Sequence, residues 1–187
     1  MKNYVKTLKL QLDEAAQLGL LAVTKTVYMG GGTPSLLGQG AVDLAHHTSS
    51  ITHPIEFSME ANPDSLSDEL LASLSAGGVT RISLGVQSFN DNELKGLGRI
   101  HSADLAYDRV LAAKESGYEV SVDLMCAIPE QTESSWEYTL SRFISLGVNH
   151  VSVYPLTIED GTALAKQTQD KDISWNAYDV QADRMQT

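Results

Sequence analysis

The chain has 187 residues, of which 42% are hydrophobic and 20% charged, so it is long enough for one globular core but short for a complete α/β barrel. A formal net charge of −11 and the lack of a Lys/Arg cluster disfavour nucleic acid as a partner. No run approaches the roughly 20 apolar residues of a membrane span, and no secretion signal is recognisable, so we expect a cytoplasmic protein. A single cysteine, Cys126, excludes an internal disulfide and a self-contained cysteine metal site.

Apolar periodicity and turn residues predict strands that alternate with helices along the chain. The expected helices are 5–18, 41–50, 65 or 67 to 76, a short one from 90, 102–116, 133–146 and 174–185. The expected strands are 24–29, 55–59, 81–86, 120–125 and 150–154. Asn90 and Glu93 are expected to form a capping box at the short helix. Regular alternation of this kind indicates βαβ units and a parallel sheet, which is an α/β fold.

Each predicted strand ends in glycine or in a polar residue. The carboxyl ends of parallel strands lie at one edge of a sheet, where ligands bind in α/β folds. These residues are therefore expected to share one binding site. In chain order they are Gly30–Gly31–Gly32 with Thr33, then Glu60, Gln87, Asp123 and Tyr154–Pro155.

The residue types at these strand ends suit a nucleoside that carries a zwitterion. A glycine run exposes backbone N–H and C=O groups, and an acid such as Glu60 can bind a ribose diol. Gln87, Arg99 and Asp123 add polar partners. The glycine run matches neither the P-loop nor the dinucleotide-binding spacing.

Simpler interpretations of the same residues stay open. The glycines can form an ordinary turn, Glu60 can be solvated, and Arg99 can form a surface ion pair worth at most about 1 kcal/mol. Gln87 can cap the helix that follows it. Asp123 is the hardest to explain in this way, because it lies within an apolar strand where an unpaired carboxylate is costly.

Five segments of the chain resemble the radical S-adenosylmethionine (SAM) proteins of the oxygen-independent coproporphyrinogen III oxidase family, most closely its haem-chaperone-like branch. They occur in the order of the family and span nearly the whole chain. The segments are VYMGGGTPSLL (27–37), FSMEANPDSL (57–66), RISLGVQSFNDNELKGLGRIH (81–101), VDLMCAIPEQT (122–132) and HVSVYPLTIEDGTALAK (150–166).

This resemblance implies a parallel-sheet partial (β/α)₆ barrel that binds SAM. The glycine loop would face the amino acid part of SAM, and the remaining residues would complete the site. Whether one or two SAM molecules bind stays open. The residues implied in cofactor binding are Gly31, Gly32, Thr33, Glu60, Gln87, Arg99 and Asp123.

The family also binds a [4Fe–4S] cluster through three cysteines in a CxxxCxxC loop after its first strand. This chain has one cysteine and no such loop. The resemblance therefore implies that residues 1–187 are an incomplete radical SAM core of about five βα units, truncated so that the first strand and the C-terminal domain are missing. Strand 24–29 would then be an unpaired edge, and the chain alone would be inactive.

Three functions remain from the sequence. The first is the SAM-binding core of a coproporphyrinogen oxidase-like protein in haem metabolism. The second is a haem chaperone, a carrier that binds haem without oxidising a porphyrinogen; porphyrinogen or haem would thus be the partner of the full-length protein. The third is an unrelated, cluster-free α/β barrel enzyme that uses Glu60 and Asp123 as acid and base.

Overall fold

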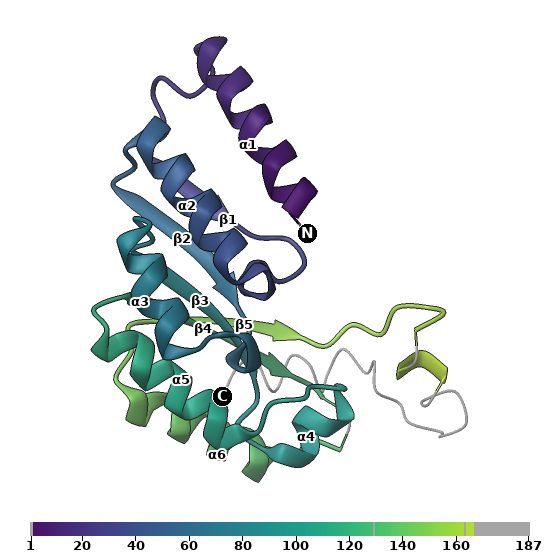
Figure 1. Ribbon diagram of the computed structural model, residues 1–187. Coiled ribbons are helices and arrows are strands. Elements are labelled where there is room, and N and C mark those ends of the chain that lie inside the picture. Colours follow the sequence, from purple (N-terminus) through teal and green to yellow (C-terminus); the bar gives the residue numbers. More distant parts are fainter. Residues whose placement is uncertain (1, 129, 163, 167–187) are drawn as a thin grey trace.

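A five-stranded parallel sheet forms the centre of the computed structural model, which describes residues 2–128, 130–162 and 164–166 (Figure 1). The strands occur in sheet order as in chain order, β1-β2-β3-β4-β5. All four pairings are parallel. The predicted α/β class and all five predicted strands are confirmed. The strands are β1 (Thr26–Met29), β2 (Glu56–Ala61), β3 (Arg81–Gln87), β4 (Glu119–Cys126) and β5 (His150–Pro155).

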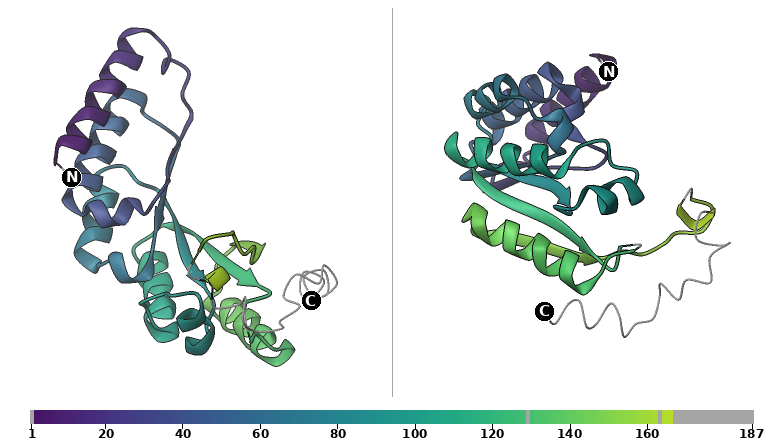
Figure 2. Two further views of the ribbon diagram at one scale, coloured as in Figure 1. Left: turned by 90° about the vertical axis from the view of Figure 1, so that its right-hand side faces the viewer. Right: turned by 90° about the horizontal axis from the view of Figure 1, so that it is seen from below.

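Helices follow the strands along the outer face of the curved sheet, and α4 lies beyond the carboxyl end of β3 (Figures 1 and 2). Within the described residues β1 pairs only with β2, so it forms one edge of the sheet, as predicted. The helix predicted at 174–185 lies outside the described residues. The helices are α1 (Lys2–Gln17), α2 (Gln39–Thr52), α3 (Asp68–Ala76), α4 (Asp91–Gly96), α5 (Ala103–Glu115) and α6 (Glu133–Leu146), with short 3₁₀ turns η1 (Pro34–Leu37) and η2 (Pro63–Ser65).

Three of the helices have a serine or threonine as their N-cap residue. The side chains of Ser67, Ser102 and Thr132 each accept a backbone N–H from the first turn of α3, α5 and α6. Such a cap satisfies an amide that has no partner within the helix. Of the two serines that the sequence left open for α3, the cap is Ser67. These caps explain why the predicted starts of the helices agree closely with the structure.

The capping box predicted at Asn90 and Glu93 is wrong. The side chain of Asn90 accepts the N–H of Asn92, and the Glu93 carboxylate does not return to the backbone of Asn90. Glu93 is instead buried, with 3% of its surface exposed, and accepts hydrogen bonds from other elements. Tertiary partners have therefore replaced the local contact that its spacing indicated.

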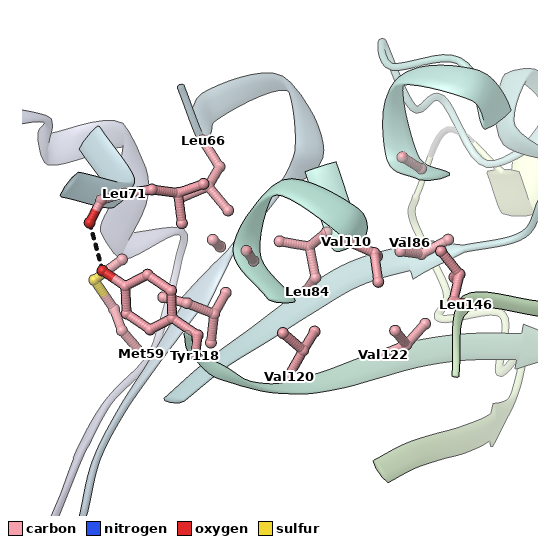
Figure 3. Packing of buried hydrophobic residues seen from close by; sticks show 14 of the residues in the cluster. Met59, Leu66, Leu71, Leu84, Val86, Val110, Tyr118, Val120, Val122 and Leu146 are labelled. Carbon is pink, nitrogen blue, oxygen red and sulfur yellow. Dashed lines mark hydrogen bonds between the residues drawn. The ribbon is translucent and has the colours of Figure 1, made fainter. Parts of the chain in front are cut away.

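The hydrophobic core lies between the sheet and the helices that cover it. Leu84 and Val86 of β3 and Val120 and Val122 of β4 point toward Val110 of α5 (Figure 3). Side chains alternate between the two faces of a strand, so the residues between these apolar ones face the opposite side. On β3, one face thus builds the core while the other is free to build a site.

Candidate functional site

A cavity of about 270 Å³ opens at the carboxyl ends of the strands. Of the predicted site residues, the structure brings Gly32, Thr33, Glu60, Gln87 and Asp123 together around it. Four strands and the glycine loop thus contribute to one polar hollow, as expected for the carboxyl edge of a parallel sheet. The complete lining is Gly32, Thr33, Glu60, Ala61, Asn62, Ser83, Gly85, Gln87, Asp123 and Tyr154.

The Glu60 carboxylate ties the glycine loop to the sheet. Its Oε1 accepts the Tyr28 hydroxyl at 2.8 Å, and its Oε2 accepts the backbone N–H of Gly31 at 3.1 Å. Partial burial, followed by the bond to Glu60, raises the pKa of Tyr28 to about 12, so the phenol keeps its proton and donates. Two of the lone-pair positions of the carboxylate are thereby used, and the others remain for a ligand.

Glycine suits the loop for two different reasons. A Cβ on Gly30 would lie 2.7 Å from Cε1 of Tyr28 and 2.9 Å from Oε1 of Glu60, so a side chain there would displace the hydrogen-bonded pair of Tyr28 and Glu60. Gly31 and Gly32 have φ of 83° and 67°, and a Cβ on either would meet nothing within 4 Å. The loop is both the turn and the open backbone surface that the sequence offered as alternatives.

Amide side chains fill the floor of the cavity between β2 and β3. A Cβ on Gly85 would lie 3.0 Å from both Oδ1 of Asn62 and Nε2 of Gln87, so glycine makes room for the two amides. Nδ2 of Asn62 donates to the Thr33 hydroxyl at 3.3 Å, which links the end of β2 to the glycine loop. The floor is therefore lined by groups that can both donate and accept hydrogen bonds.

Asp123 of β4 is a partly buried carboxylate that lines the same cavity as Glu60. The Ser83 hydroxyl donates to its two oxygens at 3.2 and 3.3 Å. Burial raises the pKa of Asp123 above its ordinary value, and this effect exceeds the stabilisation of the charge by Ser83 and Ser152. Repulsion from Glu60 acts in the same direction as burial. The site thus holds two acids that favour a cationic ligand.

We expect Asp123→Asn to raise the melting temperature of the chain at pH 8 more than at pH 4. The folded state binds the Asp123 proton more tightly than the unfolded state does. The contribution of Asp123 to stability is therefore greatest below pH 3.8, the ordinary pKa of an aspartate, and it is lost as pH rises through the raised pKa of the folded state. Asparagine carries no charge to desolvate, and each kcal/mol corresponds to roughly 2–4 °C. Thermal unfolding at pH 4 and pH 8 checks this. Asp108→Asn, at an exposed position, is the control, and an equal gain at both pH values would contradict the expectation.

Arg99 is not among the residues that line the cavity. It lies between α4 and α5, where burial lowers its pKa and the nearby Asp64 carboxylate opposes that shift. Arginine nonetheless stays charged in proteins. The structure therefore leaves Arg99 beside η2, outside the polar lining that contains the other predicted side chains.

Sequence reasoning missed Tyr28, Asn62, Ser83 and Gly85 as site residues. Each lies two or four positions from a predicted one on the same strand or loop, as in the series Ser83–Gly85–Gln87 on β3. Residues two apart on a strand share a face. Counting two or four positions before or after each predicted strand-end residue would have identified them.

The described residues contain neither a metal-ligand cluster nor a membrane-spanning helix. No group of three or more His, Cys, Asp or Glu side chains in that part of the chain is arranged to hold a metal ion. None of the helices in the described ranges is long and apolar enough to cross a membrane.

Comparison with known proteins identifies the family. The profile of the Radical SAM superfamily matches residues 2–143. The chain belongs to the Radical SAM superfamily. The resemblance found in the sequence is thereby confirmed, and the unrelated cluster-free barrel enzyme is excluded. This superfamily uses SAM and a [4Fe–4S] cluster.

Within this superfamily, the chain is similar to proteins of haem metabolism. The chain is 41% identical to the heme chaperone HemW of Lactococcus lactis subsp. lactis over 145 residues, or 74% of this chain and 38% of that protein. It is 34% identical to HemW of Mycobacterium tuberculosis over 97% of this chain and 48% of that protein. The coproporphyrinogen III oxidase HemN of Escherichia coli, a radical SAM enzyme, superposes with a TM-score of 0.82 at 25% identity, covering 99% of this chain and 44% of that one. The fold is thus the radical SAM partial barrel, and the chain spans less than half the length of these relatives.

The residues present fit SAM but not the cluster. The cavity offers an open glycine backbone, two carboxylates and two amides, which match the ammonium, carboxylate and ribose groups of SAM. A [4Fe–4S] site needs three or four thiolates, and the sequence has one cysteine. That residue, Cys126, is fully buried in the core at the end of β4.

Proposed function

We propose that this chain is the SAM-binding core of a haem-chaperone-like radical SAM protein. The observation that carries the proposal is the polar cavity at the strand ends, where Glu60 and Asp123 lie beside a glycine loop. Two carboxylates near a bare backbone suit a ligand with a sulfonium, an ammonium and a ribose, because each carries positive charge or donates hydrogen bonds. The relatives named heme chaperone support haem as the cargo of the full-length protein.

Each part of the cavity has a proposed role toward SAM. Gly31, Gly32 and Thr33 would bind the amino acid moiety, and Glu60 would accept hydrogen bonds from it or from the ribose. Gln87 and Asp123 would line the opposite wall. Arg99, which lies near Asp64 and does not line the cavity, would contribute to the outer part of the SAM site. A complete site would need three or four thiolates to hold a [4Fe–4S] cluster, which would supply the reducing electron for SAM cleavage. This chain has one cysteine, so residues 1–187 are proposed to bind SAM without cleaving it.

Titration calorimetry with the 187-residue chain tests the proposal. We expect SAM to bind and ATP not to bind, because two carboxylates repel a triphosphate and no P-loop is present to hold it. S-adenosylhomocysteine, which lacks the sulfonium charge, should bind more weakly than SAM. A folded chain that binds none of the three at millimolar concentration would overturn the proposal.

Coproporphyrinogen oxidation is a second candidate for the full-length protein, favoured by the superposition on HemN over 99% of this chain. The two functions differ in what happens to the tetrapyrrole. A chaperone takes up haem and leaves coproporphyrinogen unchanged, whereas an oxidase decarboxylates coproporphyrinogen. Incubating the full-length, cluster-loaded protein with each tetrapyrrole in turn and measuring haem retention and released carbon dioxide separates them.

A further inference from the structure

Gln87, at the end of β3, has an unusual backbone. Its φ is 71°, and the N–H of Ser88 donates to the carbonyl of Val86 at 2.9 Å, so the chain makes a three-residue turn centred on Gln87. The pairing of β3 with β4 shifts register at the same place. A γ-turn with positive φ is rare and strained, and a strained non-glycine residue persists only where its surroundings enforce it.

On one side, His101 holds the carbonyl that closes this turn. Its Nε2 lies 3.2 Å from the oxygen of Val86, and because a carbonyl can only accept, Nε2 carries the proton. The imidazole is fully buried, and its Nδ1 lies 3.7 Å from Oδ1 of Asp64. The Val86 carbonyl therefore accepts two hydrogen bonds, one from the turn itself and one from a side chain that cannot move without disturbing the core.

On the other side, Glu93 holds the residue that follows the turn. Ser88 donates its hydroxyl to Oε2 of Glu93 at 2.6 Å, and the Ser88 oxygen accepts the N–H of Asn90 at 2.9 Å. Glu93 also accepts the Ser135 hydroxyl at 2.6 Å and Nε2 of Gln131 at 3.1 Å. The buried carboxylate thus joins Ser88 to the loop after β4 and to the start of α6.

Burying the Glu93 carboxylate costs desolvation free energy. Moving its charge out of water is costly, and an apolar residue of similar size often packs at least as well. What a carboxylate supplies, and an apolar residue does not, is several directed hydrogen bonds from a single point. The arrangement therefore fits a requirement for a fixed position of Ser88 better than a requirement for core packing.

We propose that Glu93 is a positioning residue of the cofactor cavity. It fixes Ser88, and together with His101 it holds the strained turn that places Gln87 in the lining of the cavity. The role toward SAM rests on the proposed function, whereas the effect on the Gln87 turn does not. Glu93 itself is absent from the cavity lining and acts through Gln87.

Amide hydrogen exchange on the ligand-free chain tests the effect on the turn. In Glu93→Ala, the Ser88 amide should exchange about tenfold faster or more than in the wild type, because the bond to Val86 opens more often. Glu93→Gln should restore protection, since its amide can accept from Ser88 and donate to Ser135. Ser135→Ala, which leaves the link from Ser88 to Glu93 intact, is the matched control. Unchanged exchange at Ser88 in Glu93→Ala overturns the proposal.

If Glu93→Ala does not fold, Ser88→Ala removes the same link without emptying the Glu93 position. The amide of residue 88 is then followed in the same way, and the same acceleration is expected. Protection equal to the wild type in this variant also counts against the proposal.

A double-mutant cycle on SAM binding tests whether Glu93 acts through Gln87. Glu93→Ala and Gln87→Ala should each weaken SAM binding about tenfold, as expected for one hydrogen bond. The double variant should bind no more weakly than Gln87→Ala alone, because the two changes remove the same contact. Independent, multiplying effects would contradict a positioning role. If the wild type does not bind SAM while the exchange result holds, the proposed function fails and the link from Glu93 to the turn stands.

Gln87→Gly separates the strain from the contact. Glycine adopts positive φ without penalty, so this variant should melt at the same or a higher temperature than the wild type. It should nevertheless bind SAM about tenfold more weakly, because the amide side chain is gone. Thermal unfolding and titration calorimetry give both values, and Gln87→Ala, which keeps the strain, is the control. A lower melting temperature for Gln87→Gly than for Gln87→Ala would show that the turn is not strained.

Discussion

Glu60→Ala is expected to weaken SAM binding by about 100-fold, the largest loss that we expect from one cavity residue. A hydrogen bond to a charged group contributes about 1.5–3 kcal/mol, and about 1.4 kcal/mol is tenfold in affinity. The substitution also releases the N–H of Gly31 and the hydroxyl of Tyr28, which both donate to Glu60. The glycine loop would therefore lose its link to β2 through Glu60, although the hydrogen bond from Asn62 to Thr33 would remain, and the ligand would have to order the loop again.

Three further variants distinguish the effect of the Glu60 charge from the effect of its hydrogen bond to Tyr28 and from a general effect of changing a glutamate on β2. Glu60→Gln keeps an acceptor for Gly31 but loses the charge, so its loss should be intermediate, about tenfold. Tyr28→Phe removes only the hydroxyl and should change affinity less than about threefold. Glu56→Ala makes the same substitution at the opposite end of β2, away from the cavity, and should bind like the wild type. A Glu60→Ala variant that binds SAM as tightly as Glu56→Ala would refute a cofactor contact at Glu60.

Leu84→Ala is expected to destabilise the fold more than any of the cavity substitutions. Leu84 is fully buried on the central strand β3, beneath α5 (Figure 3). Removing a buried leucine side chain costs about 2–5 kcal/mol through lost burial and the cavity that remains. At roughly 2–4 °C per kcal/mol, the melting temperature should fall by about 10 °C.

Leu84→Ala should also weaken SAM binding in the folded state, because Ser83 and Gly85, which line the cavity, flank Leu84 on the opposite face of β3. Thermal unfolding measures the stability, and SAM titration at a temperature well below the transition measures the site in the folded state. Ile100→Ala is the matched control, since Ile100 is 85% exposed and should be nearly neutral. A fall in melting temperature no larger than that of the control would contradict the assigned core.

Local patterns predicted the elements well. Gly19 ends the first helix region at positive φ, and Thr132 caps α6 at the predicted residue. These signals are contained within a few residues of chain, because caps and turns satisfy nearby backbone groups. Strand ends were placed less well: β2 continues past Glu60 to Ala61, and β3 includes Gln87, since pairing with a neighbouring strand decides where a strand stops.

The composition of the site was predicted only in part. The sequence indicated the residues at the strand ends, and the structure added Tyr28, Asn62 and Ser83 from the same faces. Ser83 contacts Asp123 across 40 residues of chain, so no local pattern pairs them. The link between Tyr28 and Glu60 spans 32 residues and depends on the register of β1 against β2.

By itself the sequence determined the order of helices and strands, the parallel sheet and the edge at which its strand-end polar residues gather, because periodicity, caps and glycine turns act over short stretches of chain. Its family-specific segments determined the superfamily. Only the tertiary structure decided which strand-end side chains meet and which local contact is abandoned. Glu93 is the clearest case: its spacing from Asn90 indicates a helix cap, yet its partners Gln131 and Ser135 lie 38 and 42 residues away. A buried carboxylate takes the donors that packing brings to it, and packing is a property of the whole fold.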